Sequence, residues 1–136
     1  MQPANDALAR ELAAAADVHA ALEAERRALE SRDAAALLAA VERKSAAFGR
    51  AAGLERERPA GAAAAWRAEP RFAELAELLR RCRRLNDENG ALIRGQRRRV
   101  DAVLSLLTGS DTGRPTYGPD GAAGPARRSR GPLASA

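Results

Sequence analysis

The sequence predicts an all-α protein: an elongated antiparallel helical bundle or coiled coil of about three helices, followed by a disordered C-terminal tail. Over most of the first 107 residues, apolar side chains recur every three to four positions, the spacing of one helix face. Alanine, the strongest helix former, outnumbers leucine by 35 to 16, and only four residues are aromatic. Such a chain forms helices readily but builds a thin core, so help from a partner is expected.

Two helices are expected in the first part of the chain. Residues 5–30 carry an apolar stripe with members seven apart, and residues 34–52 carry a second stripe that ends near two glycines. A connection this short predicts either an antiparallel hairpin, which is favoured, or a single kinked helix. The candidate caps are Asn5 or Asp6 for the first helix and Ser31 or Asp33 for the second.

The third part of the chain predicts one long helix over residues 70–107, with an apolar stripe along one face. Pro70 suits the first helical turn, and Gly109 can take the left-handed conformation that ends a helix. The dipeptide Asn89-Gly90 leaves a turn as an alternative, but the seven-residue phase persists across it. Before this helix, residues 53–69 predict an interruption and a short helix that lays Trp66 over the bundle.

The net charge of +5 is concentrated in the long helix and the tail, where arginine is in excess. Such a surface attracts nucleic acid or an acidic protein, although mixed charges are also the ordinary solvated face of a helix. The interleaved aromatics of single-strand binders are missing, and arginines 80, 81, 83 and 84 encircle the helix instead of lining one face. A specific nucleic-acid partner is therefore not expected.

The residue inventory argues against an enzyme and against a bound cofactor or metal. There is one histidine, His19, and one cysteine, Cys82, and each is expected to be a packing residue of an apolar stripe. No nucleophile–base pair, metal-spaced cluster or phosphate-binding glycine loop occurs, so catalytic and metal sites are expected to be absent. The lack of a signal peptide or membrane-length apolar run and the single cysteine favour a cytoplasmic protein without membrane insertion.

The last part of the chain, residues 110–136, is dominated by glycine and proline and has no apolar periodicity. It is expected to be a disordered tail attached to a helical domain over residues 1–109. Tyr117 is its only aromatic residue, so it is either incidental or the anchor of a docking peptide. Helical faces plus a flexible peptide describe a binding or scaffolding protein.

Several motifs resemble the C-terminal half of FlgN-type flagellar export chaperones. The similarity is specific between Leu85 and Gly121, and before that it is compositional apart from a junction-like run at residues 25–33. The segment around residues 59–66 departs from the family pattern. The resembling runs are Leu85-Asn86-x-x-Asn89-Gly90-x-Leu92-Ile93, Arg97-Arg98-Arg99-Val100, Leu104-x-x-Leu107-x-Gly109 and Thr116-Tyr117-Gly118-x-Asp120-Gly121.

The resemblance implies a cytoplasmic, all-helical chaperone of flagellar type III secretion. Its partners would be the C-terminal helices of the hook–filament junction proteins FlgK and FlgL, and the export gate protein FlhA. A basic nucleic-acid-associated protein and a passive structural coiled coil stay open as alternatives. The client-binding residues expected on the long helix are Leu85, Asn86, Asn89, Leu92, Ile93, Gln96, Val100, Val103 and Leu107. Those expected to dock on the export gate are Tyr117, Gly118, Asp120 and Gly121.

Overall fold

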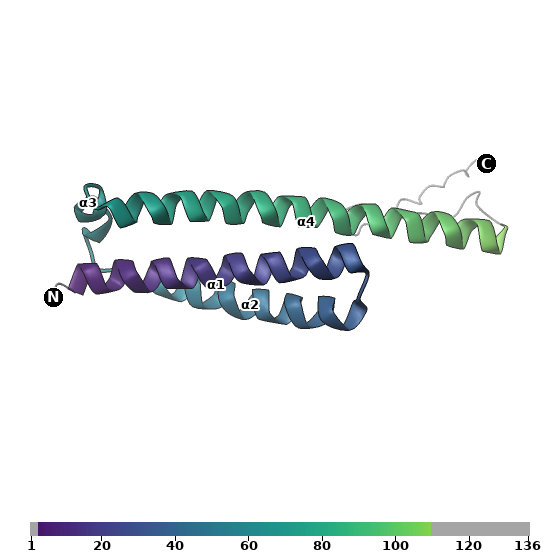
Figure 1. The fold of residues 1–136 in the computed structure, drawn as a ribbon, viewed down its shortest axis with the longest axis horizontal. Helices are drawn as coiled ribbons and strands as arrows, with labels where there is room; N and C mark the ends of the chain where they lie inside the picture. The colour runs from purple at the N-terminus through teal and green to yellow at the C-terminus, as the bar shows by residue number, and fades with distance from the viewer. Residues whose placement is uncertain (1–2, 110–136) are drawn as a thin grey trace, which may run out of the picture. The chain divides into compact units, whose positions relative to one another are not determined.

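The computed structural model describes residues 3–109, which form four α-helices and their short connections (Figure 1). The helices are α1 (Pro3–Ser31), α2 (Ala34–Arg56), α3 (Ala62–Trp66) and α4 (Pro70–Thr108), which confirms the all-α prediction. The chain divides into two compact units, residues 1–91 and 92–136. The predicted tail lies outside the described residues, so its disorder and a domain boundary after residue 109 stay predictions.

A two-residue connection joins α1 to α2. Arg32 adopts a left-handed backbone conformation with φ 57°, and the Asp33 N–H donates to the Ala28 carbonyl at 3.1 Å, which closes the end of α1. The Asp33 side chain then accepts from the Ala36 N–H at 3.0 Å. Asp33 is therefore the N-cap of α2, and it is one of the two predicted caps. Its carboxylate accepts from a backbone N–H of the first turn that has no partner within the helix.

Ion pairs across α1 and α2 show that the two helices run antiparallel, as Figure 1 also shows. Along the series, the residue number falls on α1 as it rises along α2 to Arg58, which lies two residues beyond the end of α2. This order is possible only in a hairpin, so the favoured prediction is confirmed and the single kinked helix is wrong. The pairs are Glu25 with Lys44, Asp17 with Arg50, and Glu11 with Arg58.

The start of α1 differs from the sequence-based expectation. The helix begins at Pro3, so Asn5 and Asp6 lie in its first turn and the prediction that either caps it is wrong. Proline is well suited to this position, because its fixed φ matches the helix and its missing N–H would have no helical partner. Asp6 still places an acid near the positive end of the helix dipole, as expected.

The end of α2 also differs, because the helix continues to Arg56 instead of stopping at residue 52. The glycines at 49 and 53 were expected to weaken its end. Each glycine costs only about 0.5–1 kcal/mol relative to alanine in a helix interior. The stability of the surrounding helical turns outweighs this cost. The actual stop comes just before Pro59, whose ring disfavours helical geometry in the residue that precedes it.

Trp66 closes one end of the bundle, as predicted. A left-handed Gly61 (φ 77°) starts α3, and Trp66 at its end is 1% exposed. The indole Nε1 donates to the Ala4 carbonyl at 3.0 Å, and the Arg58 guanidinium lies 5.2 Å from the ring centroid. Phe72 adds a tilted ring contact at 6.0 Å. These contacts tie the start of α1 to the end of α2 and the start of α4.

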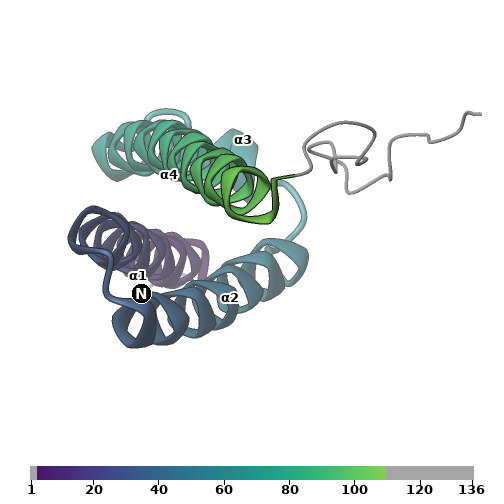
Figure 2. The same ribbon diagram turned by 90° about the vertical axis from the view of Figure 1, so that its right-hand side faces the viewer.

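The core of residues 1–91 is organised around α1, which contributes eleven buried residues, whereas α2 contributes two. Figures 1 and 2 show α2 beside α1 and the first part of α4 along another side of α1. One apolar cluster surrounds Trp66, and a second surrounds Leu22 further along α1. Many of the buried residues are alanines, so the core is thin, as the composition predicted.

The long helix α4 is continuous through Asn89-Gly90, so the alternative of a turn there is wrong. It begins at Pro70, as predicted. At the other end Gly109 takes φ 68°, and its N–H donates to the Ser105 carbonyl at 3.1 Å. In the contacts between α4 and α1, the residue numbers on both helices increase together: Cys82 contacts Ala15, and Asn89 contacts Leu22. The two helices are therefore parallel.

Candidate functional site: the apolar face of α4

The first part of α4 packs its apolar face on α1. Leu75, Cys82 and Asn89 are its three buried residues, and their seven-residue spacing places them on one face. The Cys82 sulfur lies 3.7 Å from the Ala15 carbonyl oxygen, and the side chain belongs to the second apolar cluster. Burial raises the pKa of the Cys82 thiol, against a smaller opposite effect from Arg81. Cys82 is thus a core residue, as predicted.

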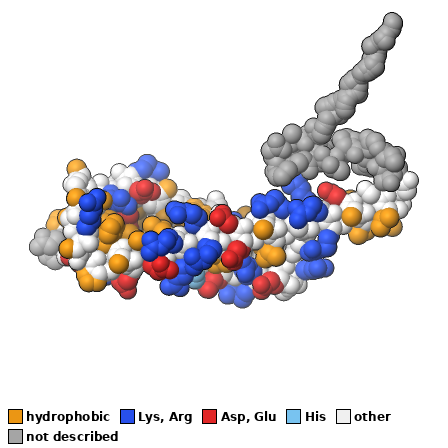
Figure 3. Space-filling model, turned by 90° about the horizontal axis from the view of Figure 1, so that it is seen from above, with side chains coloured by type: hydrophobic (Ala, Val, Ile, Leu, Met, Phe, Trp, Pro, Cys, Tyr) orange, Lys and Arg blue, Asp and Glu red, His pale blue; other side chains and the backbone are white. Residues whose placement is uncertain are grey.

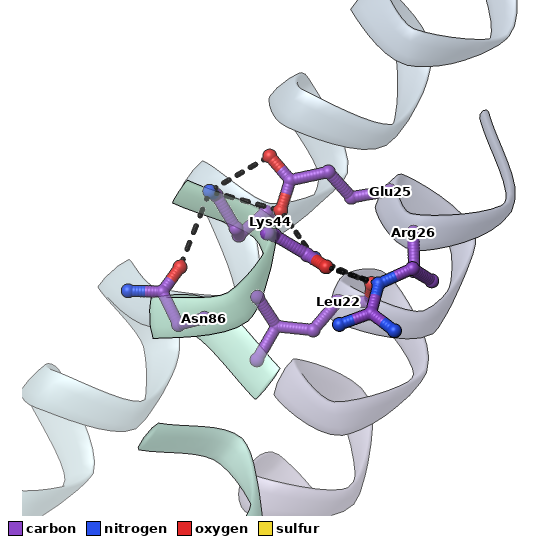
Figure 4. Close-up of polar contacts among 6 residues, drawn as sticks. Leu22, Glu25, Arg26, Lys44 and Asn86 are labelled. Carbon is purple, nitrogen blue, oxygen red and sulfur yellow. Dashed lines mark hydrogen bonds and ion pairs between the residues drawn. The ribbon is translucent and has the colours of Figure 1, made fainter. Parts of the chain in front are cut away.

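A buried carboxylate, Glu25, joins all three long helices (Figure 4). The Lys44 Nζ of α2 donates to both Glu25 carboxylate oxygens, at 3.0 and 3.2 Å. From α4, the Asn89 Nδ2 donates to Glu25 Oε1 at 2.9 Å and to the Leu22 carbonyl at 3.0 Å. A buried charge is costly unless it is paired and hydrogen-bonded, and here it has both kinds of partner.

Further polar contacts extend this cluster. The Arg26 Nε donates to Asn89 Oδ1 at 2.8 Å, and its Nη2 lies 2.7 Å from Glu88 Oε1. Lys44 reaches Asn86 Oδ1 at 3.4 Å, the contact drawn at the left of Figure 4. A one-turn slip of α4 would leave the buried Glu25 and Asn89 without these partners. The cluster therefore fixes the axial position of α4 against α1 and α2.

Three of the nine expected client-binding residues lie within this packing. Asn89 has no exposed surface, Asn86 is half-buried beside Lys44, and Leu85 packs against the second apolar cluster. Asn86 and Asn89 therefore contact other helices of the chain itself. Direct contact of these three residues with a client stays a prediction.

The other expected client-binding residues lie in the last part of α4 and are mostly open to solvent. Gln96 is half-buried, and it makes an interaction of its own. At about 100° per residue, Ile93, Val100 and Leu107 continue the helix face that carries Cys82 and Asn89. The exposed fractions are 36% for Leu92, 39% for Ile93, 57% for Val100, 52% for Val103 and 77% for Leu107. We call these five residues the distal stripe.

Two further exposed leucines were not among the expected binding residues. Leu104 is 53% exposed and lies one turn beyond Val100 on the same face, so helical spacing alone would have found it. Leu106 is 82% exposed but lies to one side of the stripe, and only the exposure shown by the structure singles it out. Exposed apolar side chains this close together are typical of a protein-binding surface.

The last part of α4 is also strongly basic. Residues 92–108 contain four arginines, at 94, 97, 98 and 99, and a single acid, Asp101. All four arginines are exposed, and none forms an ion pair within residues 3–109. In Figure 3, basic side chains group on this part of α4, and apolar side chains lie beside them and nearer the end of the helix. The surface therefore combines an apolar stripe with unneutralised positive charge.

A groove of about 450 Å³ opens between α2 and the first part of α4. Its floor includes Ala15 and Val18 of α1, and Phe48 and Leu79 stand on its two sides. Phe48 is 41% exposed and Leu79 43%, so α2 and α4 do not close over α1. Both apolar side chains are therefore accessible from solvent.

The described residues contain no group of three or more histidine, cysteine, aspartate or glutamate side chains that could hold a metal. None of the described helices is long and apolar enough to cross a membrane. The expected gate-docking residues Tyr117, Gly118, Asp120 and Gly121 lie outside the described residues. Among residues 3–109, the feature that best fits a function is therefore the distal stripe.

An all-α fold that leaves an apolar helix face open defines a helical binding protein. The model of the family described as FlgN protein matches residues 1–125, and the chain belongs to this family. It is accordingly a flagellar export chaperone, a protein of flagellum assembly that binds export substrates. No curated protein and no solved structure matches the chain significantly.

Proposed function

We propose that the chain binds the C-terminal helices of the hook–filament junction proteins FlgK and FlgL in the cytoplasm. By covering those helices it prevents premature assembly, and it then delivers the client to the export gate protein FlhA. The observation that carries the proposal is the distal stripe, which leaves five apolar side chains of one helix exposed. Family membership supplies the class of client.

A helix with an open apolar stripe is suited to an amphipathic client helix, because the two stripes remove each other from water. Full burial of a valine or leucine side chain contributes about 1.5–3 kcal/mol. Val100 and Leu107 are each more than half exposed, so they have most of this contribution still to gain. In the first part of the same helix, the buried residues of the stripe already pack against α1. The client is therefore expected on the last part of α4.

The test adds two charges to the stripe and compares them with two charges on the opposite side of the helix. Val100→Asp with Leu107→Asp should weaken binding of the FlgK or FlgL C-terminal segment at least about 100-fold, measured by calorimetry. The matched control, Ala102→Asp with Ser105→Asp, adds the same charge and should cost less than about fivefold. Circular dichroism should show near-equal helicity for both. Equal losses in the two variants would refute the stripe as the client site.

Delivery to FlhA is proposed to depend on Tyr117, which sits in a Tyr-Gly-Pro-Asp-Gly motif beyond α4. The support is the resemblance of this motif to the family pattern together with the family match, which extends to residue 125. An anchor joined by a short linker would let one chaperone hold client and gate at once. Binding of client and binding of gate should then be separable.

Tyr117→Ala tests this separation on a single variant. Its affinity for the client segment should stay within error, whereas its affinity for the cytoplasmic domain of FlhA should fall at least tenfold, and motility should decrease. Tyr117→Phe is the control, because it keeps the aromatic ring that supplies most of the buried area. Undiminished gate binding by Tyr117→Ala would remove Tyr117 as the anchor. Loss of client binding would show that this residue contributes to the client site.

A further inference from the structure

Two arginines border the distal stripe on opposite sides. At about 100° per residue, Arg97 and Arg99 fall to either side of the line through Ile93, Val100 and Leu107. These are the positions that flank the apolar seam in a coiled coil, where charged side chains select the partner helix. Arg94 and Arg98 lie on the far side of the same helix and give a natural comparison.

The two flanking arginines have no acidic partner within the described residues. Both are exposed, and neither forms an ion pair there. Elsewhere in the described chain, Arg26, Arg58 and Arg80 each contact a glutamate at 3.0 Å or less. The last part of α4 therefore offers two guanidinium groups beside an apolar stripe. A partner with an apolar face and acidic side chains would cover the stripe and pair with both guanidinium groups.

We infer that the distal stripe takes an amphipathic helix whose apolar seam is flanked by aspartate or glutamate residues facing Arg97 and Arg99. The inference rests on the proposed function and specifies the chemistry of the client helix. Apolar contact supplies most of the affinity. The flanking arginines favour a partner with negative charge and increase its association rate. Arginine suits this role, because its planar guanidinium can bind a carboxylate through two parallel hydrogen bonds.

Charge argues against a second copy of this chain as the occupant. A second distal stripe would bring the same four arginines with only one acid, so like charges would meet along the seam. Nucleic acid is also disfavoured, because a phosphate backbone would leave Val100, Val103 and Leu107 in water. An acidic amphipathic helix is the occupant that satisfies both the stripe and the arginines.

The test uses two synthetic helical peptides with the same leucine seam, one flanked by glutamates and the other by lysines. The full-length protein should bind the glutamate peptide at least tenfold more tightly in 50 mM salt. The preference should shrink in 500 mM salt, because exposed ion pairs are screened. Equal affinity for the two peptides at low salt would overturn the inference. So would stronger binding of duplex DNA than of the glutamate peptide, or self-association that displaces it.

A pair of charge-matched variants then tests whether the two flanking positions are responsible. Arg97→Glu with Arg99→Glu should reverse the preference, so that the lysine peptide binds more tightly. Arg94→Glu with Arg98→Glu makes the same change in net charge on the far side of the helix, and it should keep the preference for glutamate. Both variants should retain helicity by circular dichroism. An equal effect of the two variants would assign the preference to net charge and overturn the role of Arg97 and Arg99.

The same variants separate this inference from the proposed function. If the FlgK and FlgL segments bind the wild-type chain but Arg97→Glu with Arg99→Glu binds them equally well, the charge inference fails and the proposed function stands. If the glutamate peptide is preferred but neither junction-protein segment binds, the proposed client is wrong and the acidic character of the partner is supported.

Discussion

The buried pair of Glu25 and Lys44 gives the sharpest test of how this thin bundle is held together. Lys44→Met keeps the aliphatic stem but removes the ammonium group that contacts both carboxylate oxygens of Glu25. Glu25 has no exposed surface of its own, so its carboxylate has little access to water that could replace the lost partner. The Asn89 Nδ2 would remain as its only side-chain hydrogen-bond donor among the contacts described above. A buried charge would then be left largely uncompensated.

Removing one partner of a fully buried ion pair costs about 3–5 kcal/mol. Lys44 is 22% exposed, so solvent already screens part of this pair, and a loss of about 2–3 kcal/mol is expected. For a domain of this size the corresponding fall in melting temperature is roughly 10–20 °C. Thermal unfolding followed by circular dichroism measures the melting temperature, and urea unfolding followed by Trp66 fluorescence measures the free energy of unfolding.

Two companion variants make the result specific to burial of the charge. Arg80→Met breaks an exposed pair with Glu77 and should cost less than about 0.5 kcal/mol. Adding Glu25→Gln to Lys44→Met removes the uncompensated charge, and it should recover stability to within about 1 kcal/mol of the wild type. If Lys44→Met costs no more than Arg80→Met, or if the double variant is no more stable than Lys44→Met, the reasoning is refuted.

Four further predictions follow from individual side chains and backbone angles. Arg32→Gly should raise the free energy of unfolding by about 1 kcal/mol in urea, because glycine adopts the left-handed φ of 57° at lower cost than arginine. Gly49→Ala should stabilise by about 0.5–1 kcal/mol in the same assay, because a methyl group there would meet no atom within 4 Å; no gain would show strain in α2. Trp66→Phe should lower stability by about 1–2 kcal/mol, since the hydrogen bond from Nε1 to the Ala4 carbonyl is lost, and an unchanged urea midpoint would contradict this. Burial raises the pKa of the Cys82 thiol, so its stabilising contribution is full below the ordinary thiol pKa and is lost as the pH rises through the raised value. The melting temperature of the wild type should therefore fall more steeply in alkaline solution than that of Cys82→Ala, and parallel pH profiles would contradict it.

Helix positions followed from the sequence because they depend on local chemistry. The apolar spacing located the three long helices, Pro70 and Gly109 set the limits of α4, and Asp33 was among the predicted caps. The errors lie where local signals compete. Asn5 and Asp6 are good caps in isolation, but Pro3 starts α1 earlier. The glycines of α2 weaken a helix, yet their cost is too small to end it.

Only the tertiary structure decided which parts of each face have a partner. Asn89 and Leu107 belong to the same helical stripe, yet Asn89 has no exposed surface and Leu107 is 77% exposed. Likewise Glu25 looks like an ordinary surface charge in sequence, but it lies buried between Lys44 and Asn89. Periodicity fixes the side of a helix on which a residue lies, because that depends on 3.6 residues per turn. Burial depends on segments far away in the chain, because a stripe is covered only where another helix reaches it.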